Sequence, residues 1–354
     1  MNSNPSGLAV FIGKSRPYSP RDTGKVLLSN LARRNHAVTG VFLYPGDPLF
    51  EWAHVRFPTY FVHPFLTMSF YTMKNAYRTN AVPEDFLQWI DWFSGQSYER
   101  GLSFFSGWIP PSVFELFEGK IVNFHPGPLP ELPGYEPETM AVLLGLDIFY
   151  GTLHVVEEKF DSGEILWHSP PIKIGAYDGP VRILYKTTIR AVRGLPRIIK
   201  RWSKGTLPQF STEGRSQVLY ASSKACRRFA VLDWEQDGVE SILRKNRAFN
   251  EQEISLDLLV HVFGEIFVVE DAKSLSSTSA RLFVSFKKNT NTSIVGEKVG
   301  TFRGLGIFRG APVFTALNGY VVLLLRNPSI SLAARTKRLG INLRNQPSQL
   351  EKIF

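Results

Sequence analysis

Hydrophobic and polar positions alternate along the first 200 residues in a way that predicts strands and helices in turn. Residues 8–12 are a short apolar run, and residues 37–43 are a second one that ends before a Pro-Gly-Asp turn. Between them, residues 21–34 place apolar side chains at helical spacing. A strand, a helix and a strand at this spacing predict an α/β unit with parallel strands.

The same alternation continues to about residue 202, while residues 58–81 are aromatic and follow neither period clearly. Further strands are expected at 101–105, 120–125 and 151–156, and further helices at 83–94, 111–117, 137–144 and 183–202. Residues 1–205 are therefore predicted to form an α/β domain with a mostly parallel sheet.

The remaining chain has a different pattern. Residues 206–230 lack apolar periodicity and carry Pro, Gly, Ser and Thr, so we interpret them as a linker. After a predicted helix at 239–249, short apolar or alternating runs predict strands at 258–269, 281–286, 313–316 and 319–325. We expect a smaller, β-rich and open barrel-like C-terminal domain over residues 231–354.

Composition narrows the class of protein. With 354 residues, 44% hydrophobic and 20% charged, the chain has the make-up of a globular protein with room for two domains. The single cysteine, Cys226, rules out an internal disulfide framework and a Cys-rich metal site, and we expect no metal. The polar N-terminus and short apolar runs predict neither a signal peptide nor a membrane span, hence a soluble, cytoplasmic protein without a membrane partner.

The charge is uneven along the sequence. The formal net charge is +10, and the larger part of this excess lies after residue 205. Such a surplus suits nucleic acid, a nucleotide or an acidic membrane as a partner, and it equally suits a solvated surface biased towards Lys and Arg. Both interpretations stay open.

Candidate chemistry is concentrated at the end of the strand predicted at 120–125. Asn123 and His125 are two residues apart and therefore share a face of that strand. An Asn amide can donate to an oxyanion, and a His can move protons or stabilise the oxyanion when charged. Asp161, in an Asp-Ser-Gly segment, can hold the imidazole or order a water. The three suit acyl transfer through a tetrahedral intermediate; the alternative is a structural Asn/His pair and an ordinary turn.

These residues belong to a longer set of motifs: Asn-x-His-Pro-x-x-Leu-Pro at 123–130, Gly-Thr-x-His at 151–154 and Asp-x-Gly at 161–163. The set resembles the formyltransferase family that uses 10-formyltetrahydrofolate, which includes glycinamide ribonucleotide, methionyl-tRNA and sugar N-formyltransferases. The resemblance covers roughly residues 8–202. It implies a Rossmann-like domain, 10-formyltetrahydrofolate as cosubstrate, and Asn123, His125 and Asp161 as the catalytic trio.

The resemblance also implies that two loops hold the pterin ring of the folate, mostly through backbone groups. The corresponding residues here are Ser106, Trp108, Ile109 and Pro110 in one loop and Glu157 and Glu158 in the other. His154 matches a histidine of the family's small-molecule branch, or it is a strand residue that faces the core.

The second half carries a weaker resemblance. Leu232-Asp233-Trp234 and Arg247-Ala248-Phe249-Asn250 are similar to the start of the C-terminal barrel of methionyl-tRNA and amino-sugar formyltransferases. The Pro and Gly that usually follow are replaced by Glu251-Gln252-Glu253.

The acceptor is where the sequence departs from its tRNA-modifying relatives. Residues 44–56, which match their basic loop, hold two acids, one Arg and three aromatic residues, whereas phosphate contacts require Lys and Arg. Leu132-Pro133-Gly134 also replaces an Arg-Gly of the family. Both departures argue against tRNA, and the basic second half argues for it. We expect a small amine acceptor such as an amino-sugar nucleotide, with Tyr135 and Glu136 in its pocket or as turn residues without contact.

Three alternatives remain. The first is a methionyl-tRNA formyltransferase. The second is a formyltetrahydrofolate hydrolase, which would use the same trio with water as acceptor. The third is a non-catalytic binding protein on the same fold.

Overall fold

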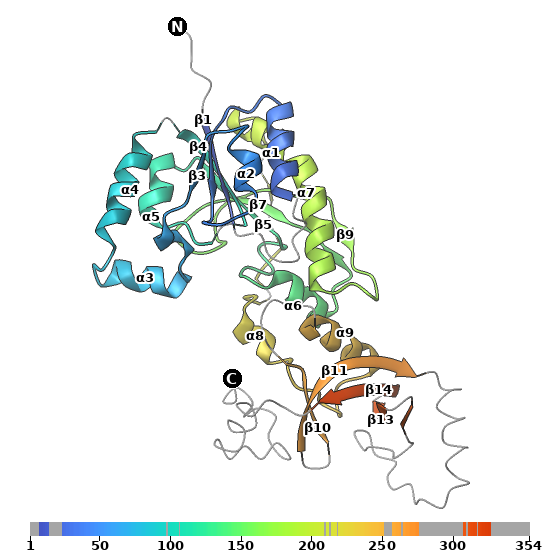
Figure 1. The fold of residues 1–354 in the computed structure, drawn as a ribbon. Coiled ribbons are helices and arrows are strands. Elements are labelled where there is room, and N and C mark those ends of the chain that lie inside the picture. Colours follow the sequence, from blue (N-terminus) through green and yellow to red (C-terminus); the bar gives the residue numbers. More distant parts are fainter. Residues whose placement is uncertain are drawn as a thin grey trace, which may run out of the picture. The chain divides into compact units, whose positions relative to one another are not determined.

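The strand–helix alternation produces a seven-stranded sheet in the computed structural model of the chain (Figure 1). Its order is β3-β2-β1-β4-β5-β7-β8. The strands are β1 (Gly7–Ile12), β2 (Val38–Leu43), β3 (Thr59–Phe61), β4 (Tyr98–Phe104), β5 (Ile121–His125), β7 (Thr152–Val155) and β8 (Ile165–His168). The first five in this order pair in parallel, and β7 is antiparallel to both β5 and β8. The predicted α/β fold with a mostly parallel sheet is confirmed.

The structure describes residues 7–13, 23–96, 98–105, 107–208, 210–211, 214–217, 219–250, 257–262, 265–275, 307–308, 311–316 and 318–326. They divide into two compact units. The first unit comprises Met1–Pro137, Ile148–Ile174 and Val181–Tyr220; the second comprises Glu138–Asp147, Gly175–Pro180 and Ala221–Phe354. The predicted linker is thus shared between them, and the boundaries expected at 205 and 231 stay a prediction.

Helices cover both faces of the seven-stranded sheet. They are α1 (Thr23–Arg33), α2 (Phe50–Ala53), α3 (Phe70–Arg78), α4 (Glu84–Ser94), α5 (Pro111–Phe114) and α7 (Pro180–Ser203), with 3-10 turns η1 (Pro64–Thr67) and η2 (Glu115–Phe117). A small two-stranded sheet pairs β6 (Ile148–Phe149) with β9 (Ile172–Lys173). Figure 1 shows α1 and α7 on one side of the sheet and α3, α4 and α5 on the other.

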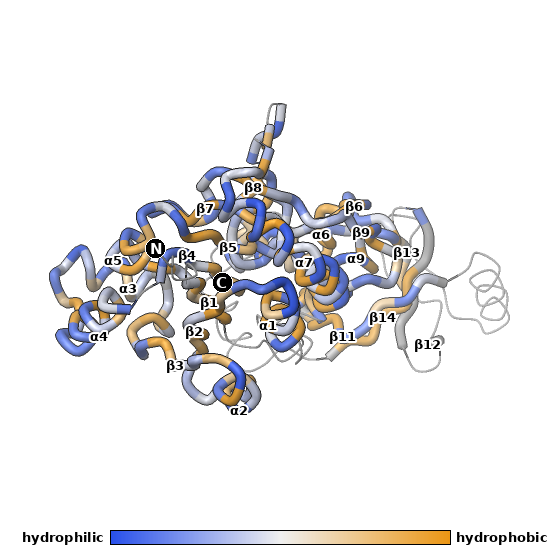
Figure 2. Tube along the Cα trace, turned by 90° about the horizontal axis from the view of Figure 1, so that it is seen from above, coloured by the Kyte–Doolittle hydropathy of each residue, from blue (hydrophilic) through white to orange (hydrophobic). Residues whose placement is uncertain are grey.

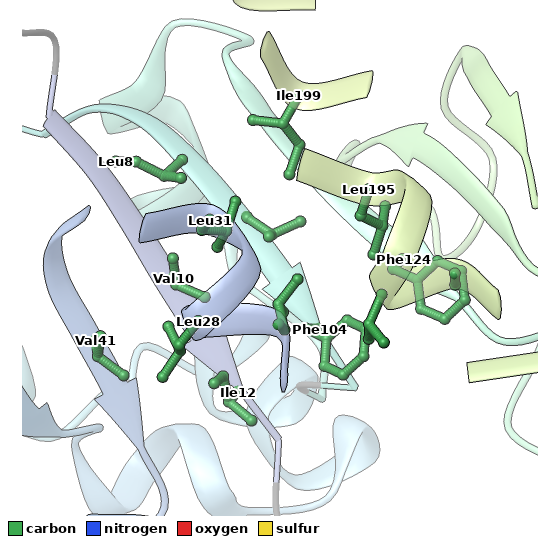
Figure 3. Packing of buried hydrophobic residues seen from close by; sticks show 14 of the residues in the cluster. Leu8, Val10, Ile12, Leu28, Leu31, Val41, Phe104, Phe124, Leu195 and Ile199 are labelled. Atoms are coloured by element: carbon green, nitrogen blue, oxygen red, sulfur yellow. The ribbon is translucent and has the colours of Figure 1, made fainter. Parts of the chain in front are cut away.

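Alternation along β1 shows how the two faces are filled. Leu8, Val10 and Ile12 point towards α1 and α7, and the residues between them join the core beneath α4 and α5 (Figure 3). Along α7, apolar residues such as Leu195 and Ile199 recur on the side that packs on the sheet, so hydrophobic and hydrophilic residues alternate along its coil (Figure 2).

Phe124 anchors the strand that carries Asn123 and His125. Its ring is 1% exposed and stacks on Phe104 with centroids 5.4 Å apart. The chain crosses this ring at Gly151, where any Cβ would collide with the Phe124 ring. The polar residues of β5 therefore point away from a firmly packed core.

Several elements were not predicted from the sequence. The aromatic stretch at 58–81 contains β3, η1 and α3, and β8 follows the Asp-Ser-Gly segment. β3 has only three residues at the edge of the sheet, too short to show a period of two.

The second unit contains a five-stranded sheet in which every pair is antiparallel. Its order is β10 (Leu259–Val262), β11 (Glu265–Leu275), β14 (Gly319–Arg326), β13 (Ala311–Ala316) and β12 (Ile307–Phe308). The helices are α6 (Pro137–Leu144), α8 (Ser223–Arg227) and α9 (Val239–Asn250). Trp234 stacks on Phe314, and Lys245 pairs with Asp237 at 2.5 Å. The expected β-rich region is confirmed, and the strand predicted at 281–286 lies outside the described residues.

Among the helices that the structure describes, none is both long and apolar enough to cross a membrane.

Replacing Phe124 with Ala should lower the free energy of unfolding by about 3–5 kcal/mol, because it leaves a large cavity against Phe104. Urea denaturation followed by circular dichroism measures this loss. Leu87→Ala, on an α4 side chain that is 50% exposed, is the matched control and should cost less than about 1 kcal/mol. Similar small losses in both variants would contradict the packing described for β5.

Candidate active site

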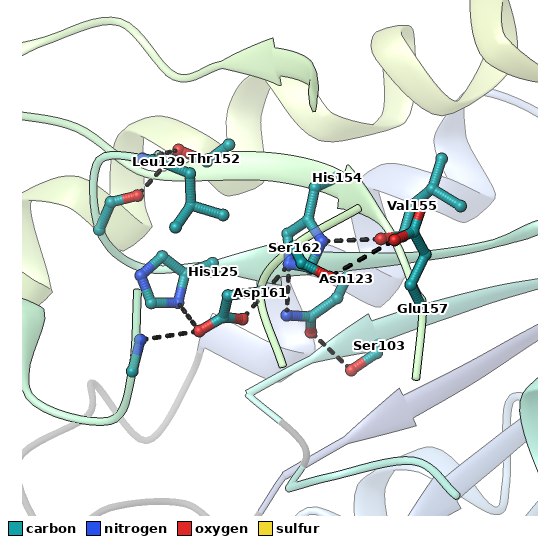
Figure 4. A network of polar contacts seen from close by, with 12 residues as sticks. Ser103, Asn123, His125, Leu129, Thr152, His154, Val155, Glu157, Asp161 and Ser162 are labelled. Carbon is teal, nitrogen blue, oxygen red and sulfur yellow. Dashed lines mark hydrogen bonds and ion pairs between the residues drawn. The ribbon is translucent and has the colours of Figure 1, made fainter. Parts of the chain in front are cut away.

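Ser103, Asn123 and His154 form a row across three neighbouring strands. Asn123 is paired in register with Ser103 of β4 on one side and with His154 of β7 on the other. The Ser103 hydroxyl donates to Asn123 Oδ1 at 2.7 Å, and Asn123 Nδ2 lies 3.1 Å from His154 Nε2 (Figure 4). The pairing of the strands therefore brings together residues that are far apart in sequence.

The hydrogen bonds of this row assign its donors and acceptors. His154 Nδ1 lies 2.8 Å from the Val155 carbonyl oxygen, so it donates there, and Nε2 of the same ring faces the Asn123 amide nitrogen. Asn123 Oδ1 is then the acceptor for Ser103. Since Nδ2 carries two hydrogens and one is directed at His154, the other can serve a ligand oxygen.

His125 ends β5 on the same face as Asn123 and is 2% exposed. Its Nε2 lies 3.0 Å from the Leu132 carbonyl, and its Nδ1 lies 3.4 Å from Asp161 Oδ2. Both ring nitrogens thus face acceptors. This arrangement favours the doubly protonated, positively charged imidazolium.

Asp161 closes the site over the two histidines. Its side chain is 2% exposed, and its other oxygen, Oδ1, lies 3.5 Å from His154 Nε2. The backbone N–H of Gly134 donates to Oδ2 at 2.8 Å. Burial by itself would raise the pKa of Asp161, but His125, His154 and the Gly134 N–H together lower the pKa below its ordinary value. The carboxylate is therefore ionised although it is buried.

The Asp-Ser-Gly motif has a steric explanation. Asp161 adopts a left-handed backbone with φ 53°, which Asp tolerates better than most residues. At Gly163 a Cβ would collide with the carbonyl oxygen of Val155 on β7. Only glycine lets the chain pass this close to the strand and return the carboxylate to His125 and His154.

A cleft of about 350 Å³, counting space open to solvent, lies beside this network. Its lining residues are Ser103, Gly107, Trp108, Ile109, Asn123, His154, Val156, Glu157, Phe160 and Asp161. A second hollow of about 290 Å³ shares Gly107, Trp108 and Ile109 with the first. The turn after β4 therefore separates two spaces, one polar at its base and one largely apolar.

Phe105 sets the path of this turn. Its φ of 57° is rare for an aromatic residue and costs about 1–3 kcal/mol. Its ring packs against Phe104 and Phe124. Beyond it, the Gly107 N–H donates to the Tyr44 hydroxyl at 3.2 Å, and burial raises the pKa of Tyr44. The ring contacts of Phe105 and the hydrogen bond of Gly107 thus hold the strained turn, so that residues 107–109 line the cleft.

The structure brings most of the predicted site residues together. Asn123 and Asp161 line the cleft, and His125, which is not among the lining residues, contacts Asp161 with its Nδ1 3.4 Å from Oδ2. Of the predicted folate-contacting residues, Trp108, Ile109 and Glu157 line the cleft, Pro110 and Glu158 lie outside the lining, and Ser106 falls outside the described residues.

The predicted acceptor residues lie next to each other in sequence but differ in exposure. Tyr135 is 40% exposed and packs against Phe160, with ring centroids 5.0 Å apart, while Glu136 is buried. Burial raises the pKa of Tyr135. Sequence reasoning missed Ser103 and Phe160, because only the strand register and the loop path place them at the cleft.

Comparisons with known proteins agree with this architecture. Residues 101–199 match the family model described as formyl transferase. A methionyl-tRNA formyltransferase of Treponema pallidum is 26% identical over 193 residues, which cover 54% of this chain and 56% of the relative. A phosphoribosylglycinamide formyltransferase of Bacillus subtilis is 34% identical over 58 residues, covering 16% of this chain and 30% of the relative. The match thus spans little more than half the length of the methionyl-tRNA relative.

Two solved structures are similar in fold. HypX from Aquifex aeolicus, in complex with tetrahydrofolic acid, superposes with a TM-score of 0.53 at 18% identity, covering 91% of this chain and 44% of that chain. A sugar N-formyltransferase from a Shewanella species gives 0.52 at 14% identity, covering 77% of this chain and 100% of that chain. These two structures share the fold of this chain, and the family match over residues 101–199 confirms the resemblance seen in the sequence motifs.

Asp161→Asn should change stability in a pH-dependent way. Because the pKa of Asp161 is lowered in the folded state, its charge stabilises the fold above the unfolded value, and this contribution is lost as the pH falls through the lowered pKa. The variant should be about 1.5–3 kcal/mol less stable at pH 7. Its stability should also decline less than that of wild type between pH 5 and pH 3.

Denaturant titrations at several pH values test this, with Asp91→Asn on the exposed side of α4 as control. A wild-type acid dependence that survives unchanged in Asp161→Asn would show that the buried carboxylate is not ionised.

Proposed function

We propose that this chain, whose residues 101–199 belong to the formyl transferase family, transfers the formyl group of 10-formyltetrahydrofolate to a primary amine. The observation that carries the proposal is the grouping of Asn123 and Asp161 at the base of one open cleft, with His125 directly behind the carboxylate. An amide donor, a buried anion and a histidine at one place are the groups that acyl transfer to an amine requires.

The cleft has properties that suit a reduced folate. Trp108, Ile109 and Phe160 supply apolar walls, and the backbone of residues 107–109 and 156–161 borders the same space. A flat heterocycle with donors and acceptors on its edge fits between such loops, because the walls cover its faces and backbone groups meet its edge. The fold that this chain shares with the tetrahydrofolate-bound HypX supports the same assignment.

In this proposal the folate supplies the formyl group as an activated amide. The amine nitrogen forms the new C–N bond, and the bond between the formyl carbon and the folate nitrogen breaks. The second N–H of Asn123 donates to the formyl oxygen as negative charge develops there. The Asp161 carboxylate accepts the proton that the amine loses, directly or through a water, and that proton passes to the folate nitrogen as it leaves.

In this proposal His125 acts through its positive charge, which lies next to the Asp161 carboxylate. The imidazolium keeps Asp161 anionic and offsets part of the negative charge that builds up on the formyl oxygen. Loss of this ring removes both effects at once.

The acceptor that the geometry favours is a small amine, with an amino-sugar nucleotide as our leading candidate. Residues 44–56, which match the basic loop of tRNA-modifying relatives, contain α2, and their one cation, Arg56, is held locally. Its guanidinium lies 4.7 Å above the Trp52 ring and donates to the Trp52 carbonyl at 2.9 Å. Phe50 stacks on Phe61 with centroids 4.3 Å apart. Such a loop offers aromatic surface in place of phosphate-binding charge.

His125→Ala should lower turnover at least about a hundredfold, as the loss of an acid–base or oxyanion-stabilising group typically does. Formylated product is measured by mass spectrometry with 10-formyltetrahydrofolate as donor. His36→Ala, at a histidine whose Nε2 lies 2.7 Å from the Pro196 carbonyl and outside the cleft lining, is the matched control and should retain wild-type turnover per folded molecule. Near-normal turnover of a folded His125→Ala protein would refute the proposed role.

A panel of acceptors distinguishes the remaining activities. Nucleotide-linked amino sugars, glycinamide ribonucleotide and methionyl-tRNA are each incubated with the enzyme and 10-formyltetrahydrofolate, alongside a reaction without amine. We expect formylation of an amino-sugar nucleotide. Formyl-methionyl-tRNA as the sole product would overturn the choice of acceptor, and formate released at the same rate without amine would identify a hydrolase.

A further inference from the structure

Arg215 lies between α7 and α8, in the segment whose composition predicts a linker, yet its guanidinium contacts four other residues. It forms a bidentate ion pair with Glu131, with Nε–Oε1 at 2.7 Å and Nη2–Oε2 at 2.8 Å. Nη2 also donates to the Leu129 carbonyl at 3.0 Å and contacts the Tyr150 hydroxyl. Nη1 lies 3.4 Å from His168 Nδ1.

The loop that Arg215 holds is the one that orients the catalytic groups. Leu129 and Glu131 bind Arg215, and one residue further on the Leu132 carbonyl accepts from His125. Two residues beyond that, the Gly134 N–H binds the Asp161 carboxylate. The two contacts to Arg215, at residues 129 and 131, are thus followed directly by the two contacts to the site, at residues 132 and 134, within six residues of one loop.

We propose that Arg215 is a positioning residue that fixes the loop at 129–134 and, through it, the geometry of His125 and Asp161. The inference rests on the proposed function for its catalytic consequence, while the hold on the loop is a property of the structure alone. Arg215 touches neither the cleft nor the reacting groups.

The acceptors around Arg215 suit the planar guanidinium of arginine better than the compact ammonium group of lysine. The side chains of Arg215 and Glu131 are 24% and 25% exposed, so the pair is partly shielded from water. Burial and the neighbouring guanidinium lower the pKa of His168 to about 4, and the neutral ring can accept from Nη1. His168 is itself held by ring contacts to Tyr150 and Phe210, at 4.5 Å and 4.3 Å. A lysine could meet one or two of these acceptors, but not all of them.

A second contact keeps the segment against the loop. The Leu219 N–H donates to the Glu131 carbonyl at 3.2 Å, so the backbone of residue 131 is held as well as its side chain. Removing the Arg215 side chain leaves the partly buried Glu131 carboxylate without its bidentate ion pair and the Leu129 carbonyl without this donor. The loop then loses its contacts to Arg215 but keeps the groups that bind His125 and Asp161.

The test compares Arg215→Ala, Arg215→Lys and Glu131→Gln with wild type. Arg190→Ala is the matched control, because Arg190 also donates to a backbone carbonyl, that of Pro171, on an exposed part of α7. Turnover and KM for 10-formyltetrahydrofolate are measured together with the hydrogen exchange rate of the Gly134 N–H. Exchange does not depend on activity.

We expect Arg215→Ala to lower kcat about 10- to 100-fold, as a misplacement of about 1 Å at a catalytic group does, with little change in KM for the folate. Gly134 should exchange faster, Arg215→Lys should recover part of both losses, and Arg190→Ala should behave as wild type. If Arg215→Ala does not fold, the same pattern in weaker form is expected from Arg215→Lys and Glu131→Gln.

Unchanged exchange at Gly134 in the folded variants would overturn the hold on the loop. Faster exchange with unchanged kcat would overturn the positioning role. A fall in kcat matched by an equal loss of folded protein, with the same residual kcat per folded molecule, would assign Arg215 a structural role only. If the wild type transfers no formyl group to any acceptor, the proposed function fails, and Gly134 exchange still decides whether Arg215 holds the loop.

Discussion

The buried carboxylate of Asp161 is the constraint on which the rest of the site depends. An ion removed from water costs several kcal/mol unless charge and hydrogen bonds replace its hydration. Here the replacement comes from three directions: His125 at the end of β5, His154 on β7 and the Gly134 N–H in the loop between them. Each of these groups must be in place for the charge to be tolerated. The position of the carboxylate therefore depends on the end of β5, on β7 and on the loop between them at the same time.

The sheet makes this coupling possible because one face of β5 is polar and the other is packed. Phe124 is held by Phe104 on the side of α1 and α7, and the alternation of the strand then turns Asn123 and His125 to the opposite side. The antiparallel β7 contributes His154 in register with Asn123. A slip of one residue in either pairing would exchange the polar row for apolar side chains and bury the wrong groups.

The sequence was a good guide where chemistry and periodicity are local. It predicted the strands β1, β2, β4, β5 and β7 and the long helices α1, α4 and α7, and the motifs identified Asn123 and Asp161, which line the cleft. It missed what depends on register and long-range packing. Ser103 has no motif of its own, and Arg215 stands in a stretch without periodicity, so only the folded chain brings it to Glu131. The catalytic role of His125 stays a prediction; its contact with Asp161 at 3.4 Å depends on the path of the loop after β7, which no spacing in the sequence encodes.

The contact between Arg215 and the loop at 129–134 also concerns the order of synthesis. A ribosome releases Ser103, Asn123, His154 and the carboxylate loop before residue 215, so a nascent chain can pair its strands while the outer restraint is still missing. Arg215, which holds the loop at 129–134, lies near the C-terminal end of the first unit. Products of interrupted translation that stop within α7 would therefore contain the polar row without Arg215, and only a chain that extends to Leu219 includes all of these contacts.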